Sequence, residues 1–166
     1  MYTDLTKGNI GKSLLLFALP MMAGNLFQQF YNIADTLIVG RVLGSEALAA
    51  VGSAYTLMTF LTSLIIGLCM GSGALFSKSF GADELDELRA DIRISFVFIG
   101  FVTLVMYVIV FSGVDLILRM LAIPDEIYKM TKSYVQIIFV GIGFTFLYNF
   151  FAYLLRSIGN SVVPLI

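Results

Sequence analysis

Histidine is absent from this chain of 166 residues, and cysteine occurs once, at position 69. Without imidazole groups, the chain cannot build a histidine zinc site or a histidine proton relay. A single cysteine excludes a disulfide within the chain, and because Cys69 lies in an apolar run we expect a small packing residue. Charged residues make up 13% of the sequence, against about 25% in a typical soluble domain, so the composition argues against a soluble protein.

Hydrophobic residues, by contrast, make up 59% of the chain, and they gather in long runs. A membrane-spanning helix needs roughly 20 consecutive apolar residues, whereas a strand of a membrane β-barrel needs about ten residues that alternate. Apolar and polar residues do not alternate in these runs, so the sequence predicts an all-α, polytopic bundle of transmembrane helices. Four stretches of sufficient length carry no charged residue: 13–34, 47–77, 94–114 and 133–155.

These runs and the turn residues between them predict a single membrane domain over 1–166. We also expect a short amphipathic helix at the membrane surface within the charged connection 77–93. Residues 162–166 look like the opening of a fifth helix, so we expect the chain to be a fragment of a longer protein. The four predicted spans cover about 13–39, 46–76, 94–114 and 125–155.

Lysine and arginine are distributed unevenly between the two sides that these spans define. Cytoplasmic loops of membrane proteins carry an excess of both residues, so we expect a cytoplasmic N-terminus in a multi-pass protein of the plasma membrane. No cluster of basic residues is present, so we expect the lipid bilayer and no nucleic acid as a partner. The N-terminal side holds Lys7, Lys12, Lys78, Arg89, Arg93 and Arg156. The opposite side holds Arg41, Arg119, Lys129 and Lys132.

A stripe of polar residues runs along the first predicted span and ends in a carboxylate. Asn25, Gln28, Asn32 and Asp35 are spaced three, four and three residues apart, which is the repeat of one helix face. Carboxylates at membrane depth usually face a bundle interior or a wet cavity, and they often mark ion pathways. The polar stripe therefore predicts a cavity, with Asp35 as its candidate ion-binding residue.

Tyr148 and Asn149, which lie within the last predicted span, are further candidates for the cavity wall. Structural roles for all of these residues remain open at this point. Asp35 lies five residues before the predicted turn at Gly40, where a solvated carboxylate at the membrane surface is the alternative. The amides of the polar stripe are equally suited to hydrogen bonds between helices.

Four short motifs follow one another along the chain. They are Leu19-Pro20 with the segment 28–41 (QQFYNIADTLIVGR), the segment 47–52 (ALAAVG), Gly67 to Gly73 leading into Ser77 and Gly81, and the segment 155–160 (LRSIGN) with Pro164 four residues on. In this order and spacing, the chain resembles the N-terminal part of a multidrug and toxic compound extrusion (MATE) transporter. The resemblance covers essentially all of the sequence.

The resemblance implies twelve membrane helices in two lobes of six, of which this chain would supply four and the start of the fifth. It implies an antiporter that couples the entry of sodium or protons to the export of small organic, often cationic, compounds. Asp35 matches the family's residue for cation coupling and for the substrate cavity. No cofactor is implied beyond the coupling ion, and a sodium ion at Asp35 is the one metal expected. The missing C-terminal part of the transporter would be a partner of this segment.

Two other classes of membrane protein remain as alternatives. A lipid-linked glycan flippase of related architecture would be expected to use a cationic cavity, and the predicted spans contain no lysine or arginine except at their ends. A membrane scaffold that transports nothing would not need a polar stripe that ends in an acid. We do not expect an enzyme, because the predicted spans contain neither a nucleophile with its base nor a cluster of metal ligands.

Overall fold

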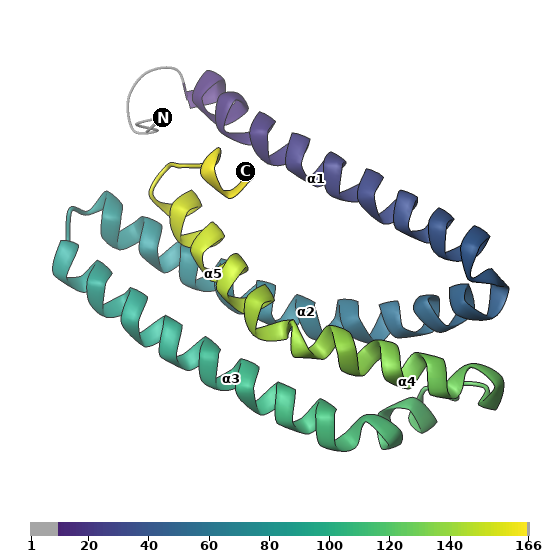
Figure 1. The fold of residues 1–166 in the computed structure, drawn as a ribbon. Coiled ribbons are helices and arrows are strands. Elements are labelled where there is room, and N and C mark those ends of the chain that lie inside the picture. Colours follow the sequence, from purple (N-terminus) through teal and green to yellow (C-terminus); the bar gives the residue numbers. More distant parts are fainter. Residues whose placement is uncertain (1–9, 166) are drawn as a thin grey trace.

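The structure, a computed structural model, describes residues 10–165, and this part of the chain is almost entirely helical (Figure 1). The described residues contain no strand, which confirms the prediction of an all-α fold. The first helix begins at Ile10, three residues before the first predicted span. The elements are α1 (Ile10–Val42), α2 (Gly44–Gly81), α3 (Leu85–Met120), α4 (Asp125–Val140), α5 (Ile142–Ser157) and the short 3₁₀ helix η1 (Val163–Leu165).

The turn between α1 and α2 is tighter than the sequence predicted. Gly44 has a φ of 88°, a left-handed conformation that glycine adopts without the steric cost of a side chain. Because this residue reverses the chain, α2 begins at Gly44, and Leu43 takes the N-cap position without a side-chain hydrogen bond. In the first helical turn, Glu46 still places a negative charge near the positive end of the helix dipole.

The predicted surface helix within 77–93 is wrong, because these residues extend the two long helices instead. After α2 ends, the chain reverses at Asp83, whose φ is 60°, and α3 then runs without a break to Met120. The hydroxyl of Ser79 donates a hydrogen bond of 2.8 Å to the Asp91 carboxylate across this reversal. Leu88 is buried and belongs to the hydrophobic core, so the first turns of α3 pack within the bundle.

The last predicted span, 125–155, is two helices and not one. α4 and α5 meet at Gly141 with a bend of 46°. At the break, the Gly141 amide donates to the carbonyl of Ile138, three residues back, in place of the usual partner four residues back. This bend directs α5 across α2, as Figure 1 shows.

The core of the bundle lies around α2, which contacts every other α-helix of the described chain. Phe76 of α2 and Phe150 of α5 are both fully buried, with ring centroids 5.9 Å apart. Phe150 also meets Phe96 of α3 at 5.2 Å, edge to face. Glycine supplies a second close approach, since Gly73 of α2 lies against Tyr153 of α5.

α1 is attached to this core along one edge. Among the described elements it contacts only α2 and η1, and none of its described side chains is fully buried. In Figure 1, α1 diverges from α5 along the upper edge of the bundle. The separation leaves room between α1 and α5, and the candidate site described below lies there.

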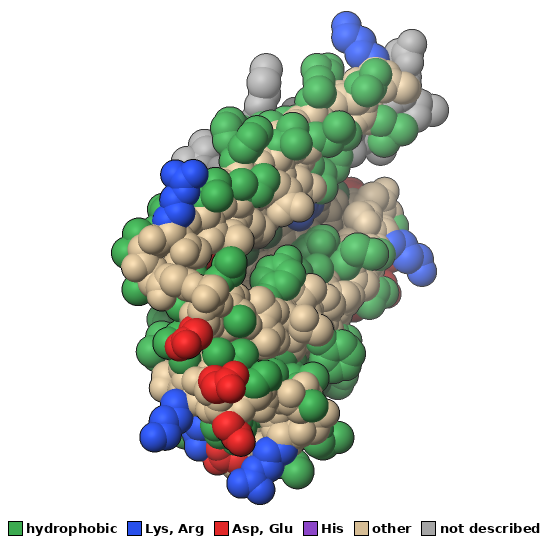
Figure 2. Space-filling model, turned by 90° about the vertical axis from the view of Figure 1, so that its right-hand side faces the viewer, with side chains coloured by type: hydrophobic (Ala, Val, Ile, Leu, Met, Phe, Trp, Pro, Cys, Tyr) green, Lys and Arg blue, Asp and Glu red, His purple; other side chains and the backbone are tan. Residues whose placement is uncertain are grey.

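Two helices of the described chain, α2 and α3, are each long and apolar enough to cross a membrane, and the bent pair α4 and α5 together forms a third such span. α1 has the length, with 33 residues, but its polar stripe makes it less apolar than these. One face of α3 exposes a run of large apolar side chains suited to lipid: Ile94, Val97, Phe98, Phe101 and Leu104. Figure 2 shows several acidic and basic side chains close together in the lower part of the view, further basic ones at the top and sides, and hydrophobic side chains over much of the remaining surface.

Candidate functional site

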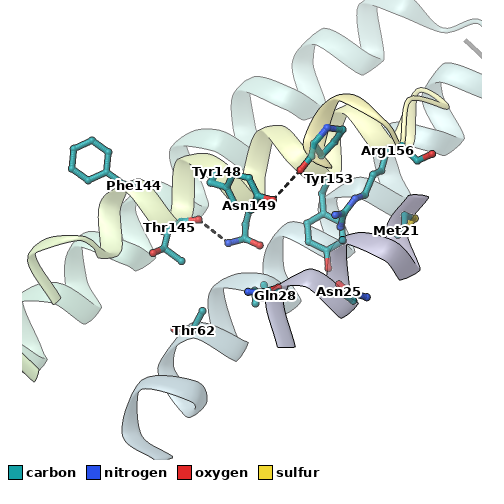
Figure 3. Close-up of a pocket in the computed structure, with 14 residues that line it drawn as sticks. Met21, Asn25, Gln28, Thr62, Phe144, Thr145, Tyr148, Asn149, Tyr153 and Arg156 are labelled. Atoms are coloured by element: carbon teal, nitrogen blue, oxygen red, sulfur yellow. Dashed lines mark hydrogen bonds between the residues drawn. The ribbon is translucent and has the colours of Figure 1, made fainter. Parts of the chain in front are cut away.

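A cavity of about 660 Å³ lies between α1, α2, α5 and the segment that carries η1. Cavities that hold small organic molecules commonly have volumes of about 300–1,000 Å³. We call it the main cavity (Figure 3). Its walls are Met21, Gly24, Asn25 and Gln28 of α1, Thr62 and Ile66 of α2, Phe144, Thr145, Tyr148, Asn149, Tyr153 and Arg156 of α5, and Ser161 and Pro164.

Four of the six predicted site residues line the main cavity: Asn25 and Gln28 from α1, and Tyr148 and Asn149 from α5. These two pairs are more than a hundred residues apart in the sequence and face each other across the space between the helices. The Asn149 amide donates a hydrogen bond of 2.8 Å to the carbonyl of Thr145, and Tyr148 donates one of 3.0 Å to the carbonyl of Pro164.

Asn32 lies in a different place. It lines a second groove of about 590 Å³ between α1 and α2, whose other walls are mostly apolar. There the Asn32 amide donates a hydrogen bond of 3.1 Å to the side chain of Gln29, and its backbone carbonyl accepts one of 2.8 Å from Thr36. The predicted polar stripe is therefore divided between two hollows on either side of α1.

Asp35 lines neither of these hollows. It is half-buried on the outer part of α1, close enough to Tyr134 of α4 for its charge to act on that phenol. Seven residues separate Asp35 from Gln28, which corresponds to roughly 10 Å along a helix. The structure thus places the candidate coupling residue outside the main cavity, within electrostatic range of its outer end.

Arg156 is the wall residue that sequence analysis missed, since it lies one residue beyond the last predicted span. It lies in the last turn of α5, with its guanidinium carbon 5.3 Å from the centre of the Tyr153 ring. A pattern in the sequence could have revealed it, because Thr145, Asn149, Tyr153 and Arg156 follow one another at steps of four, four and three along one helix face.

A compact turn after α5 holds Arg156 at the end of the main cavity. Gly159 has a φ of 86°, and the amide of Asn160 returns to the carbonyl of Leu155 at 2.9 Å, which closes the helix. The side-chain oxygen of Asn160 then accepts hydrogen bonds from the amides of Val162 and Val163, at 3.3 and 3.2 Å. The segment 155–160 is therefore a helix end followed by a cap for η1, and 163–165 forms a 3₁₀ turn where a fifth helix was expected to begin.

The walls of the main cavity are suited to binding an organic molecule. Phe144, Tyr148 and Tyr153 supply aromatic surface, and the side-chain amides of Asn25 and Gln28 supply hydrogen-bond donors and acceptors. No group of three acidic, histidine or cysteine side chains that could hold a metal ion occurs within residues 10–165. A sodium ion at Asp35 would thus need backbone or amide oxygens for its other ligands, and this site stays a prediction.

Comparison with known proteins assigns the chain to a family. The MatE family model matches residues 20–166, which is most of the sequence. This chain belongs to the MATE family. The match includes every residue of the main cavity, and it establishes that the family resemblance of the four sequence motifs is correct.

Curated relatives of this MATE chain are multidrug transport proteins. It is 33% identical over 162 residues to "Probable multidrug resistance protein YpnP" of Bacillus subtilis, covering 98% of the chain and 36% of the relative. It is 27% identical over 164 residues to "Multidrug export protein MepA" of Staphylococcus aureus, covering 96% of the chain and 36% of that relative. The chain therefore spans about a third of the length of the curated relatives that it matches.

Solved structures share the fold of this MATE chain. A MOP superfamily transporter from Pyrococcus furiosus matches with a TM-score of 0.90 at 23% identity, over 99% of this chain and 37% of that one. An outward-facing MATE family multidrug resistance transporter gives the same TM-score, identity and coverage. At this identity, the likeness establishes a helical membrane bundle and nothing about substrates.

Proposed function

We propose that this chain is the N-terminal part of a cation-coupled antiporter that exports small organic compounds, with sodium or protons as the coupling ion. The observation that carries the proposal is the main cavity, to which α1 and α5 each contribute a pair of polar residues predicted for substrate binding. The multidrug resistance protein and the multidrug export protein among the curated relatives support the same function. The remaining two-thirds of such a transporter would supply the second lobe, in a plasma membrane with the N-terminus on the cytoplasmic side.

Asp35 is the residue that we propose for ion coupling. A bound sodium ion or proton neutralises its carboxylate, and a cationic compound in the main cavity, roughly 10 Å away along α1, then loses a favourable charge. The two ligands therefore disfavour each other's binding. Such reciprocal coupling between two sites is what exchange of ion for substrate requires.

α1 is the element that we propose to transmit this coupling. It carries both Asp35 and the cavity residues Asn25 and Gln28, and it is held to the described bundle only through α2 and η1. A helix with few packed neighbours changes its position at a lower free-energy cost than one that is buried on all sides. Ion and substrate would then each favour a different position of α1.

One observation favours a second candidate function, that of a lipid-linked glycan flippase of related architecture. The sequence argued against it because no basic residue was expected within the spans, yet Arg156 lines the main cavity. A cationic cavity wall suits the phosphate groups of such a lipid. The antiporter remains the preferred function, because the flippase gives no role to Asp35.

The test uses the full-length protein that carries this chain, reconstituted in vesicles with an imposed sodium or proton gradient. We expect Asp35→Asn to abolish gradient-driven export of a fluorescent organic cation, because the amide has nearly the same shape but carries no charge or exchangeable acid proton. Asp86→Asn is the matched control, since Asp86 is 99% exposed in an ion pair with Arg89. Export by Asp35→Asn at the parent's rate under both gradients would contradict the proposed role.

A further inference from the structure

The main cavity carries one formal charge, and that charge is positive. Of the 14 described residues that line it, Arg156 is the only one that is charged at neutral pH, and no aspartate or glutamate is among them. An organic cation alone would therefore meet a like charge at this end of the cavity. In a cavity that binds only cations, an arginine in the wall would weaken binding by charge repulsion.

Among residues 10–165, no acidic side chain forms an ion pair with the Arg156 guanidinium. Ion pairs join Arg89 to Asp86 and Lys132 to Asp115 among the described residues, and none of these four residues lines the main cavity. The described contact of Arg156 is with the face of Tyr153, 5.3 Å from the ring centre, and Figure 3 shows the two side chains next to each other. An aromatic face stabilises the cation but accepts no strong hydrogen bond.

A hydrogen-bond donor of Arg156 is also left without a partner. Its Nε is buried and makes no hydrogen bond, and it is the only such buried side-chain nitrogen or oxygen among the described residues. Buried polar groups in proteins nearly always find a partner, because an unmade hydrogen bond costs about 1–3 kcal/mol. Long basic side chains near a membrane surface usually extend to water, whereas Arg156 is more than half buried and turned into the cavity wall.

We propose that Arg156 binds an acidic group, a carboxylate or a phosphate, of a compound that enters the main cavity. A guanidinium presents paired N–H donors that match the two oxygens of such a group. The buried Nε has no partner of its own among the described residues, and the buried Ser161 also lines the main cavity. The rest of the ligand would lie against Ile66 and Phe144, so the acidic compound also needs an apolar part.

The proposal rests on the proposed function in one respect: the bound compound would be one that the transporter exports. The acidic group could come from a soluble organic acid or from the headgroup of a membrane lipid, since both present the same oxygens to Arg156. Binding assays distinguish these sources, and they need no ion gradient, so they do not depend on transport.

The experiment measures the affinity of the full-length protein in nanodiscs of zwitterionic lipid for a carboxylated xanthene dye and for its methyl ester. We expect the parent to bind the acid more tightly than the ester, and Arg156→Gln to weaken binding of the acid by about tenfold or more while leaving the ester unchanged. Arg156→Lys keeps the charge but loses the paired donors, so it should retain part of the preference. Arg119→Gln is the matched control. Arg119 is an exposed arginine in the last turn of α3 and does not line the main cavity, so this variant should change neither affinity.

A second arm adds anionic phosphatidylglycerol to the nanodiscs. If this lipid displaces the acidic dye from the parent but not from Arg156→Gln, the lipid headgroup occupies the Arg156 site, and otherwise the ligand is a soluble acid. Either result is compatible with binding of an acidic group. Equal affinity of the parent for acid and ester, or equal weakening of both in Arg156→Gln and Arg156→Lys, would overturn the proposal. Gradient-driven export that depends on Asp35 would still support the proposed function in that case.

Discussion

The backbone of Gly73 in α2 lies against Tyr153 in α5, so closely that a Cβ atom at position 73 would come within 3.5 Å of the Tyr153 side chain and carbonyl. Tyr153 in turn stacks beneath the Arg156 guanidinium. A Cβ atom at position 73 would thus make an ordinary van der Waals contact with Tyr153, and the side-chain atoms beyond the Cβ of a larger residue are the ones that would crowd α5. The pair Gly67 and Gly71, whose spacing is typical of helix contacts in membranes, faces open space instead.

Gly73→Leu should separate α2 from α5 and destabilise the protein by about 1–3 kcal/mol, because the larger side chain overpacks the contact. The free energy of unfolding in detergent micelles is the measurement. Gly67→Leu is the matched control, since a Cβ atom at position 67 meets nothing within 4 Å. Equal destabilisation by both variants would show that the contact of α2 with α5 is not the cause.

Phe150→Ala should destabilise the bundle by about 3–5 kcal/mol, since it removes a buried aromatic ring from the core. Phe150 is 1% exposed and packs edge to face against both Phe76 and Phe96. Phe144→Ala on the same helix is the control, because Phe144 is 76% exposed at the wall of the main cavity. We expect the second variant to change ligand affinity and leave the unfolding free energy within about 0.5 kcal/mol of the parent.

Ser79→Ala should cost about 1.5–3 kcal/mol of unfolding free energy, because it leaves the half-buried Asp91 carboxylate without its hydrogen-bond donor. The same loss should increase hydrogen exchange in the turn between α2 and α3. Ser77→Ala serves for comparison, since the Ser77 hydroxyl is exposed and donates only to the backbone carbonyl of Ala74. If Ser79→Ala left the unfolding free energy and the hydrogen exchange unchanged, this hydrogen bond would not be needed to join α2 to α3.

Gly159→Ala should destabilise the turn after α5 by about 1–2 kcal/mol, because its φ of 86° is strained for any residue with a Cβ atom. The turn holds Arg156 at the cavity, so the variant should also weaken binding of an acidic dye. Gly143→Ala is the control, since Gly143 lies within α5 at an open position, where alanine should stabilise the helix by about 0.5–1 kcal/mol. Thermal unfolding of the two variants in parallel would reveal opposite shifts, and shifts of the same sign would contradict the explanation.

Local patterns predicted the helices well, and they failed where packing with distant residues decides the outcome. The long apolar runs gave the position of each helix because a helix satisfies its own backbone hydrogen bonds in a membrane. The bend at Gly141 was not predicted, since glycine within an apolar run is equally compatible with a straight helix. The surface helix expected near Leu88 was wrong because that residue is buried between neighbouring helices, and the sequence alone does not name those neighbours.

The sequence by itself determined that this is an all-helical membrane protein of the MATE family and that Asn25, Gln28, Asn32 and Asp35 lie along one helix. Periodicity is a local property, so it needs no knowledge of the fold. The tertiary structure decided which of these residues share a cavity with Tyr148 and Asn149, because α1 packs on α2 and η1 among the described elements and so presents different residues to different neighbours. It also placed Arg156, just beyond the last predicted span, in the cavity wall, where it is the one charged side chain among the described lining residues.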